Sequence, residues 1–322
     1  MKKQELRKVV ILSNTGESFP IEVQRFANDP SVELEVHEFT GEDDLITSCE
    51  YAHVVAFSDA KITRRVIEQL QCCVLLIRYG VGIDNIDLEA AKQRGIPVCN
   101  APSYGTVDVA EHTMALIMAM SRQIPRYDSR LRNGDWTIDT DHSNFRLENK
   151  VVGLVGFGNI ARKVCRRAQS FNMRVKVYDP YVDTQSYQSF DAEQVDLETL
   201  FSISDIISLH LPLNPSTEKI VGRRLLDRMK PNAILINTSR GKLVDLKALV
   251  YSLQRNLIAG VALDVFPDEP FALDDPILKC RNTILTPHVA WYSTESIVAL
   301  HEEVTDDIIR VLHGKQPLNR VI

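Results

Sequence analysis

The sequence predicts an α/β protein built from two doubly wound parallel-sheet domains, and three observations support this. Short β-branched runs alternate with amphipathic segments along the chain. Because parallel strands need helical crossovers, this alternation indicates parallel sheets. The chain has 322 residues, more than the roughly 100–200 of a typical single domain. It also holds too many strand-like runs for one small sheet, so we expect two α/β units.

The sequence indicates the positions of three helices and ten strands. A helix is expected at 62–70, a longer apolar one at about 104–122 and another at about 293–313. The last two follow Pro102 and Pro287 closely, which is typical of a chain entering a new element. The expected strands are 9–12, 32–36, 54–57, 74–77, 151–155, 174–178, 206–209, 234–237, 258–263 and 283–286.

Composition excludes several classes of protein. Apolar residues make up 44% and charged residues 25%, which excludes disordered, collagen-like and disulfide-stapled chains. The net charge of −6 argues against a nucleic-acid partner. The apolar runs 9–12 and 114–120 are too short for a signal peptide or a membrane span. No cysteine pair has CxxC spacing, so we expect six free thiols, no metal and a cytoplasmic protein.

Residues 151–179 carry the strongest local pattern. A strand-like VVGLV run leads into GFGNIA (156–161), a helical segment, a second strand and then Asp179. This order matches the fingerprint of a Rossmann-type dinucleotide site, whereas an isolated glycine motif would often be a chance turn. A carboxylate at Asp179 can accept hydrogen bonds from ribose hydroxyls and would repel a 2′-phosphate. No arginine follows to receive such a phosphate, so the predicted cofactor is NAD rather than NADP.

Each position of the glycine motif has a mechanical reason. Gly156 permits a tight turn out of the strand, and Gly158 lets the backbone approach a pyrophosphate. Asn159 and Ile160 open the following helix, whose free N–H groups and positive dipole end attract phosphate.

Three later strands each lead into polar residues, namely Arg240, the pair Asp264 and Glu269, and His288. Ligands of doubly wound sheets sit at the carboxyl ends of strands, so these side chains are expected to converge near the cofactor. Their chemistry suits hydride transfer at a 2-oxo acid. Arg240 can bind the carboxylate with two N–H donors, and His288 can exchange a proton with the reacting oxygen. Glu269 can fix the tautomer of the imidazole and favour its protonated form.

Taken singly, each of these residues has a simpler interpretation. A histidine after a proline at a helix entry is more often a turn or capping residue, and a lone Arg-Gly is usually a solvated turn. The aspartate could belong to an ordinary strand exit. Only their occurrence together with the dinucleotide fingerprint favours catalysis.

With these motifs in view, the sequence closely resembles the NAD-dependent D-isomer-specific 2-hydroxyacid dehydrogenases. By this resemblance, the family's catalytic residues fall on Arg240, Glu269 and His288, and Asp264 lies near the nicotinamide amide. The loop Tyr79-Gly80-Val81-Gly82 would bind the substrate carboxylate through backbone N–H groups. The matching stretches are RYGVGIDNID (78–87), VAEHTMALIMAMSR (109–122), GLVGFGNIA (153–161), INTSRGKLVD (236–245), GVALDVFPDEP (260–270) and TPHVAWYS (286–293).

The C-terminal stretch is similar to one branch of the family, the C-terminal binding proteins and short phosphoglycerate dehydrogenase-like enzymes. There, Trp291 matches a tryptophan that packs against the substrate side chain, and Arg78 matches an arginine at the substrate cleft. Packing at a hinge or a dimer interface is an equal alternative for Trp291. A salt bridge at the rim of the cleft is an equal alternative for Arg78.

The resemblance also implies a domain plan. A Rossmann-type NAD-binding domain, 102–290, is expected to be inserted into a flavodoxin-like substrate domain made of 1–101 and 291–322, with the substrate between them. Dimerisation through the nucleotide domain is expected. Because the chain ends soon after the last helix, no regulatory extension is expected.

Two functions remain open at this stage. The first is a D-2-hydroxyacid dehydrogenase, with a small 2-oxo or 2-hydroxy acid as substrate and no nucleic-acid or membrane partner. The second is an NADH-sensing scaffold with vestigial activity, as in the C-terminal binding proteins. The sequence does not give the substrate, the physiological direction, or whether Trp291 and Tyr104 contact the substrate.

Overall fold

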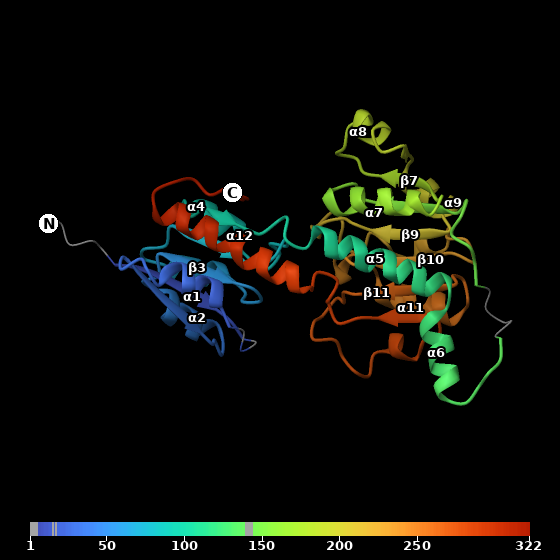
Figure 1. Ribbon diagram of the computed structural model, residues 1–322, viewed down its shortest axis with the longest axis horizontal. Coiled ribbons are helices and arrows are strands. Elements are labelled where there is room, and N and C mark those ends of the chain that lie inside the picture. Colours follow the sequence, from blue (N-terminus) through green and yellow to red (C-terminus); the bar gives the residue numbers. More distant parts are fainter. Residues whose placement is uncertain (1–5, 15, 17, 139–143) are drawn as a thin grey trace. The chain divides into compact units, whose positions relative to one another are not determined.

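The structure is a computed structural model that describes residues 6–14, 16, 18–138 and 144–322 (Figure 1). The chain divides into two compact units. Unit 1 is Met1–Gly105 with Tyr292–Ile322, and unit 2 is Thr106–Trp291. Each unit is an all-parallel sheet with helices on its faces, which confirms the predicted fold class.

Unit 1 has a five-stranded sheet in the order β2-β1-β3-β4-β5, the flavodoxin-like order. All four strand pairings are parallel. Helix α12, from the C-terminal part of the chain, contacts α1 and β4 and so completes this unit. Its elements are β1 (Arg7–Leu12), α1 (Pro20–Phe26), β2 (Val32–His37), α2 (Glu42–Cys49), β3 (Val54–Phe57), α3 (Arg64–Gln69), β4 (Leu75–Arg78), α4 (Leu88–Gln93), β5 (Val98–Cys99) and α12 (Thr294–Leu312).

Unit 2 has a seven-stranded sheet in the order β12-β11-β10-β9-β6-β7-β8. The chain order reverses between β6 and β9, which is the switch point where doubly wound folds bind their ligands. Its elements are α5 (Thr106–Ser121), α6 (Ile124–Arg132), β6 (Val151–Val155), α7 (Asn159–Ser170), β7 (Arg174–Tyr178), α8 (Thr184–Gln188), β8 (Glu193–Gln194), α9 (Leu197–Ile203), β9 (Ile206–Leu209), α10 (Arg223–Leu226), β10 (Ile234–Asn237), the 3-10 turn Gly241–Leu243, α11 (Leu246–Gln254), β11 (Gly260–Leu263), the 3-10 turn Pro276–Lys279 and β12 (Thr283–Leu285).

Two hydrophobic cores cover the two faces of the unit 2 sheet. Because side chains alternate along a strand, Ile234 and Ile236 of β10 enter one core and Leu235 enters the other. Helices α5 and α7 lie side by side over the first face (Figure 1). Residues of α9, α10 and α11 form the core on the second face. Strands buried on both faces read as continuous apolar runs, which explains why they were visible in the sequence.

The ten predicted strands are all present, with ends shifted by no more than two residues. The prediction missed β5 and β8, each of two residues. Both lie at a sheet edge, and β8 consists of Glu193 and Gln194, which are exposed. Strands of two residues form through pairing with a neighbour and are too short to show an apolar period in the sequence.

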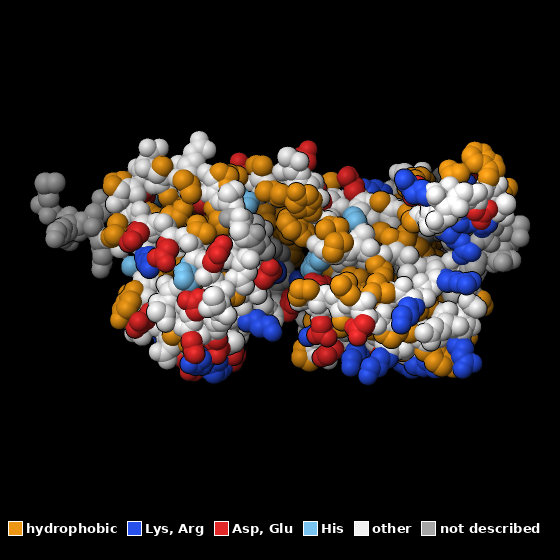
Figure 2. Space-filling model, turned by 90° about the horizontal axis from the view of Figure 1, so that it is seen from below, with side chains coloured by type: hydrophobic (Ala, Val, Ile, Leu, Met, Phe, Trp, Pro, Cys, Tyr) orange, Lys and Arg blue, Asp and Glu red, His pale blue; other side chains and the backbone are white. Residues whose placement is uncertain are grey.

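The surface carries charges of both signs. Acidic and basic side chains both appear on each unit in the face seen in Figure 2. Across the described residues, no helix is long and apolar enough to cross a bilayer, and no cluster of potential metal ligands occurs. The six cysteines are free, as predicted.

Gly153 on β6 provides a test of packing in unit 2. A Cβ at this position would lie 2.4 Å from Ser204 Oγ and 2.5 Å from Leu200 Cδ2. We therefore expect Gly153→Ala to lower the free energy of unfolding by about 1–3 kcal/mol, measured by urea unfolding with circular dichroism. Gly158→Ala is the matched control, because no atom lies within 4 Å of its added Cβ. Equal midpoints for both variants would contradict this account of β6 packing against α9.

Candidate active site

The glycine turn after β6 has the geometry expected of a dinucleotide site. Gly156 has φ +97°, a conformation that favours glycine, and a Cβ there would lie 2.6 Å from the carbonyl oxygen of His210. Its N–H donates to the Tyr178 carbonyl at 2.8 Å, which ties the turn to the end of β7. The turn therefore requires glycine both for its conformation and for space.

Helix α7 begins directly after Gly158, and no side chain caps its N-terminus. The space beside Gly158 is open, so the first-turn N–H groups at Asn159 and Ile160 are accessible to an anion. Ile160 also packs partly against the core of this face, which fixes the start of the helix. This uncapped start with open space beside it fits the pyrophosphate of a dinucleotide.

Asp179 is held at the end of β7 by two backbone donors. Its Oδ2 accepts the Phe157 N–H at 2.8 Å, and its Oδ1 accepts the Tyr181 N–H at 2.9 Å. The residue is only half-buried, so its carboxylate remains accessible. The two bonds fix a negative charge beside the glycine turn, where a ribose would lie.

His210, which the sequence analysis did not single out, follows β9 at the switch point. Its Nε2 lies 3.0 Å from Ser208 Oγ, and burial lowers the pKa of the ring to about 4. The ring is therefore neutral at pH 7. Its carbonyl packs against Gly156, so its role visible here is to shape the turn.

His288 and Glu269 form a hydrogen-bonded pair. His288 Nδ1 lies 2.7 Å from Glu269 Oε2, and both side chains are partly exposed. Glu269 Oε1 accepts the Phe266 N–H at 2.8 Å, so the carboxylate is held from two sides. Among the described residues, none forms a hydrogen bond with the second ring nitrogen of His288, and a ring held at one nitrogen in this way can serve as an oriented acid or base.

The pKa of Glu269 is lowered from its usual value of 4.5. Burial acts in the opposite direction, but the hydrogen bonds from His288 and from the Phe266 N–H outweigh it, and the charge of Arg240 adds to them. Glu269 is therefore ionised at neutral pH. The charged carboxylate therefore holds the ring at Nδ1 and fixes its orientation.

The backbone of His288 is strained, and Asp264 holds it. His288 has φ +54°, which is unusual for a residue with a side chain. Its N–H donates to the Asp264 carbonyl at 2.7 Å. The Asp264 carboxylate is fully buried and accepts the N–H groups of Val289 and Ala290 and the hydroxyl of Thr286. Asp264 thus organises the segment that presents His288.

His112 on α5 is a further residue of this network that sequence reasoning missed. Its Nε2 lies 3.3 Å from Thr286 Oγ1 and 3.7 Å from Asp264 Oδ1. The only sequence signal was a polar residue on a largely apolar helix. The partners of His112 lie more than 150 positions away, so the pattern alone could not identify them.

Arg240 lies after β10, close enough to Glu269 for its charge to act on that carboxyl group. Its carbonyl accepts Asn237 Nδ2 at 2.9 Å, and its Nη1 donates to the Ser239 carbonyl at 2.8 Å. The next residue, Gly241, packs directly on Phe266, whose N–H binds Glu269. Unit 2 therefore brings Arg240, Glu269 and His288 together.

In unit 1, the predicted loop after β4 is held by its carbonyl groups. Those of Gly80, Val81 and Gly82 accept hydrogen bonds from Ala101 N, Asn100 Nδ2 and Arg78 Nη1. In a planar trans peptide, the N–H of the next residue points the opposite way. The N–H groups of Val81 and Gly82 accordingly point away from these donors and donate to no described residue. Such N–H groups can bind an anion.

Arg78 and Trp291, the two predicted residues at the substrate cleft, belong to different units. Arg78 Nε donates to the Ser58 carbonyl and its Nη1 to the Gly82 carbonyl, so the guanidinium braces the loop. These contacts are hydrogen bonds to backbone carbonyls. Trp291 is the last residue of unit 2 and is partly exposed.

Comparison with known proteins finds a matching family model and several relatives. The family model described as D-isomer specific 2-hydroxyacid dehydrogenase, NAD binding domain, matches residues 114–290. D-3-phosphoglycerate dehydrogenase of Methanocaldococcus jannaschii is 40% identical over 294 residues, which is 90% of this chain but 55% of that relative. This chain therefore spans about half the length of that relative.

Two further relatives match over nearly their whole length. Glyoxylate reductase of Korarchaeum cryptofilum is 36% identical over 96% of this chain and 92% of its own. The solved structure of an acyclic imino acid reductase, Bsp5, in complex with NADPH and D-Arg aligns with a TM-score of 0.88. It is 33% identical and covers 98% of this chain and 100% of its own. The glycine turn, the two sheets and these matches together show that the chain belongs to the D-isomer-specific 2-hydroxyacid dehydrogenase family.

Proposed function

We propose that the protein is an NAD-dependent oxidoreductase that interconverts a D-2-hydroxy acid and its 2-oxo acid. The observation that supports this best is the His288–Glu269 pair, held 2.7 Å apart at the carboxyl side of the unit 2 sheet. Arg240 and a dinucleotide-shaped glycine turn belong to the same unit. A proton donor, a carboxylate-binding cation and a cofactor site are the groups that this reaction needs.

In the proposed mechanism, each residue of the set has one task. Arg240 binds the substrate carboxylate through parallel N–H donors and so orients the reacting carbon. When bound, the nicotinamide supplies or accepts the hydride. His288 donates a proton to the substrate oxygen during reduction and removes it in the reverse direction, and Glu269 keeps the ring oriented.

Five positions of unit 2 are proposed to hold the cofactor. Gly156 and Gly158 make room for the pyrophosphate, the N–H groups at Asn159 and Ile160 bind it, and Asp179 accepts the ribose hydroxyls.

Asp264 is proposed to act on the cofactor side as well. Its carboxylate is fully buried, so its proposed role is indirect. It holds the 286–290 segment in place beside the nicotinamide amide.

The substrate is proposed to be a small 2-oxo or 2-hydroxy acid. The N–H groups of the loop Tyr79–Gly82, braced by Arg78, would bind its carboxylate, and Trp291 would pack against its side chain. Because Arg78 already donates to two backbone carbonyls, it is poorly placed to bind a phosphate in addition. This argues for an apolar or thioether side chain over a phosphorylated substrate.

We also propose that the protein is a cytoplasmic homodimer. Large apolar side chains are exposed along α5 and α6 and the segment after them: Met118, Ile124, Leu131, Trp136 and Ile138. Trp136 and Ile138 are 87% and 83% exposed, and such residues usually mark an interaction surface.

The activity is tested by NADH oxidation at 340 nm with a panel of 2-oxo acids that includes glyoxylate and hydroxypyruvate. We expect turnover of at least one acid and a D-configured product by chiral chromatography. His288→Ala should abolish turnover with little change in NADH affinity, because the histidine acts on the substrate oxygen. The exposed His313→Ala is the control. NADH binding without turnover of any acid would favour the scaffold function instead.

The His288–Glu269 pair predicts a specific pH effect. The lowered pKa of Glu269 keeps its carboxylate charged, and the ring oriented, until the pH falls below the usual value of 4.5. The kcat should therefore show no loss from protonation of Glu269 between pH 8 and pH 5. Glu269→Gln should reduce kcat about 10–100-fold throughout this range, because the ring loses its charged partner. A variant with the wild-type kcat would remove Glu269 from this role.

Asp179 predicts the cofactor preference. Asp179→Ala removes the carboxylate that repels a 2′-phosphate, so the ratio of kcat/KM for NADH over NADPH should fall about tenfold or more. Asp183→Ala is the matched control, because this neighbouring exposed carboxylate caps α8 by accepting the Ser186 N–H. An unchanged ratio for Asp179→Ala would place ribose recognition elsewhere.

A further inference from the structure

A buried carboxylate lies in unit 1, far along the chain from the residues discussed so far. Glu22 on α1 is fully buried, and its Oε1 accepts the Tyr79 hydroxyl and lies near His301 Nδ1, each at 2.8 Å. His301 comes from α12, 279 positions away. Glu22 Oε2 has no hydrogen-bond partner among the described residues. The carboxylate is therefore only partly satisfied.

Such an arrangement is costly for stability. Burying a histidine–carboxylate pair requires the removal of water from both groups, and well-packed apolar residues of similar volume are often as stable or more stable. Phe19, Tyr79 and His301 already pack as rings with centroids 5.3–5.6 Å apart, which supplies apolar packing without a charge. Stability alone therefore does not explain why a carboxylate occupies this position.

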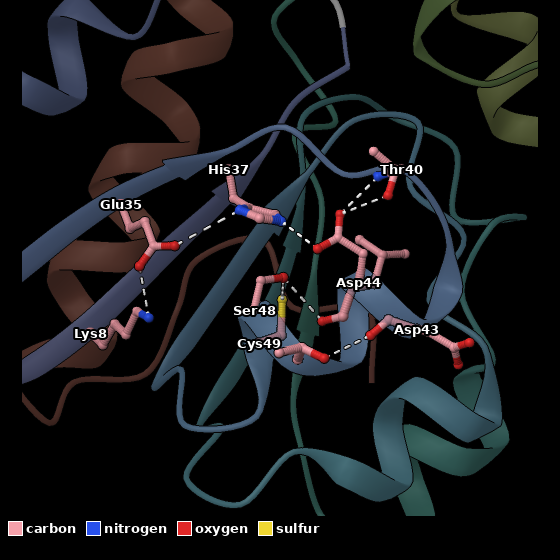
Figure 3. A network of polar contacts seen from close by, with 10 residues as sticks. Lys8, Glu35, His37, Thr40, Asp43, Asp44, Ser48 and Cys49 are labelled. Atoms are coloured by element: carbon pink, nitrogen blue, oxygen red, sulfur yellow. Dashed lines mark hydrogen bonds and ion pairs between the residues drawn. The ribbon is translucent and has the colours of Figure 1, made fainter.

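A second histidine–carboxylate pair in unit 1 provides a comparison. His37 Nε2 lies 3.1 Å from Asp44 Oδ1, and the two side chains are 26% and 32% exposed (Figure 3). Asp44 also accepts the Thr40 N–H. This pair lies at the β2 edge of the sheet, with β1 and β3 between β2 and β4. Like the Glu22–His301 pair, it joins a histidine to a carboxylate. It is partly solvated, however, and none of its hydrogen bonds within the described residues reaches the loop after β4.

The buried pair acts on that loop through Tyr79. Tyr79 is the first residue of the loop, its N–H donates to the Phe57 carbonyl, and its side chain is 7% exposed. Gly80 follows with φ +140°, in a tight approach to the Arg78 guanidinium. An anchored Tyr79 side chain therefore fixes where the loop begins. The direction of the Val81 and Gly82 N–H groups depends on that starting point.

We propose that Glu22 and His301 are positioning residues for substrate binding, which hold Tyr79 so that the N–H groups of Val81 and Gly82 are preorganised for a carboxylate. This rests on the proposed function, in which the loop binds the carboxylate of a 2-oxo acid. Glu22 supplies the acceptor for the tyrosine hydroxyl, and His301 holds the carboxylate in place. Neither residue touches the substrate.

The test compares three changes in the full-length protein. Tyr79→Phe removes the hydroxyl but keeps the ring, and E22M/H301F replaces the pair by apolar groups of similar size. Both should raise KM for the 2-oxo acid about five- to tenfold, the loss expected for one hydrogen bond. KM for NADH should stay within about twofold, since that site is in unit 2. Glu22→Gln keeps an acceptor at the same place, so its KM for the 2-oxo acid should stay close to that of the wild type.

Stability distinguishes positioning from a structural role. E22M/H301F removes the carboxylate that accepts the Tyr79 hydroxyl, so Tm is compared in the variant that also carries Tyr79→Phe. The Tm of this triple variant should equal or exceed that of the wild type, although its KM is raised. Adding Tyr79→Phe to E22M/H301F should cause no further rise in KM, because the same contact is already lost. The matched control is Asp44→Ala, which removes the comparison contact and should leave both KM values unchanged. A lower Tm with unchanged KM in the triple variant would overturn the proposal.

Two measurements separate this proposal from the proposed function. Amide hydrogen exchange at Tyr79 and Ala101, whose N–H groups bond to Phe57 and to Gly80, should be faster in Tyr79→Phe than in the wild type, with or without catalysis. Oxamate, an unreactive 2-oxo acid analogue, should bind the wild type–NADH complex about five- to tenfold more tightly than the variant. If no 2-oxo acid is turned over, the proposed function fails, and these two measurements still decide the positioning. Unchanged exchange and unchanged oxamate binding would overturn it.

Discussion

The proposed catalytic part of unit 2 depends on the hydrogen bonds that the Asp264 carboxylate accepts. This carboxylate is fully buried at the end of β11, and three donors from residues 286–290 compensate its charge. A buried charge with so many donors fixes its surroundings, because any movement would leave it unpaired. That constraint keeps His288 in a left-handed conformation that it would not adopt alone. The strain is thus stored in the segment that presents the imidazole to Glu269.

The parallel sheet explains why residues from distant segments meet. Strands β10 and β11 are adjacent and in register, so the residues that follow them emerge at one edge. Gly241 then allows the loop after β10 to pack on Phe266, and the Phe266 N–H holds Glu269. The same chain direction in β6 and β7 places the glycine turn beside Asp179. One topological rule thereby positions both the proposed cofactor residues and the proposed acid–base pair.

Much of this could be predicted from the sequence, and the failures have a physical pattern. Apolar strands buried on both faces and the glycine turn are local signals, and the structure confirms the fold that they predicted. The short edge strands β5 and β8 depend on their neighbours and left no such signal. The contacts of Arg78, His112 and Glu22 were also not visible, because each partner is set by tertiary packing. For Glu22 that partner is His301, at the other end of the chain.

Asp264 and Glu22, two of the buried carboxylates among the described residues, are anchored to different extents. Asp264 uses both oxygens and three donors, whereas Glu22 uses one oxygen and leaves the other unpaired. In the proposed function, the segment that carries the proton donor needs the tighter anchor, since hydride transfer tolerates little displacement of the reacting groups. The Tyr79–Gly82 loop has only to keep the direction of its N–H groups. In the proposed positioning, the contact of one Glu22 oxygen with the Tyr79 hydroxyl is enough for that task.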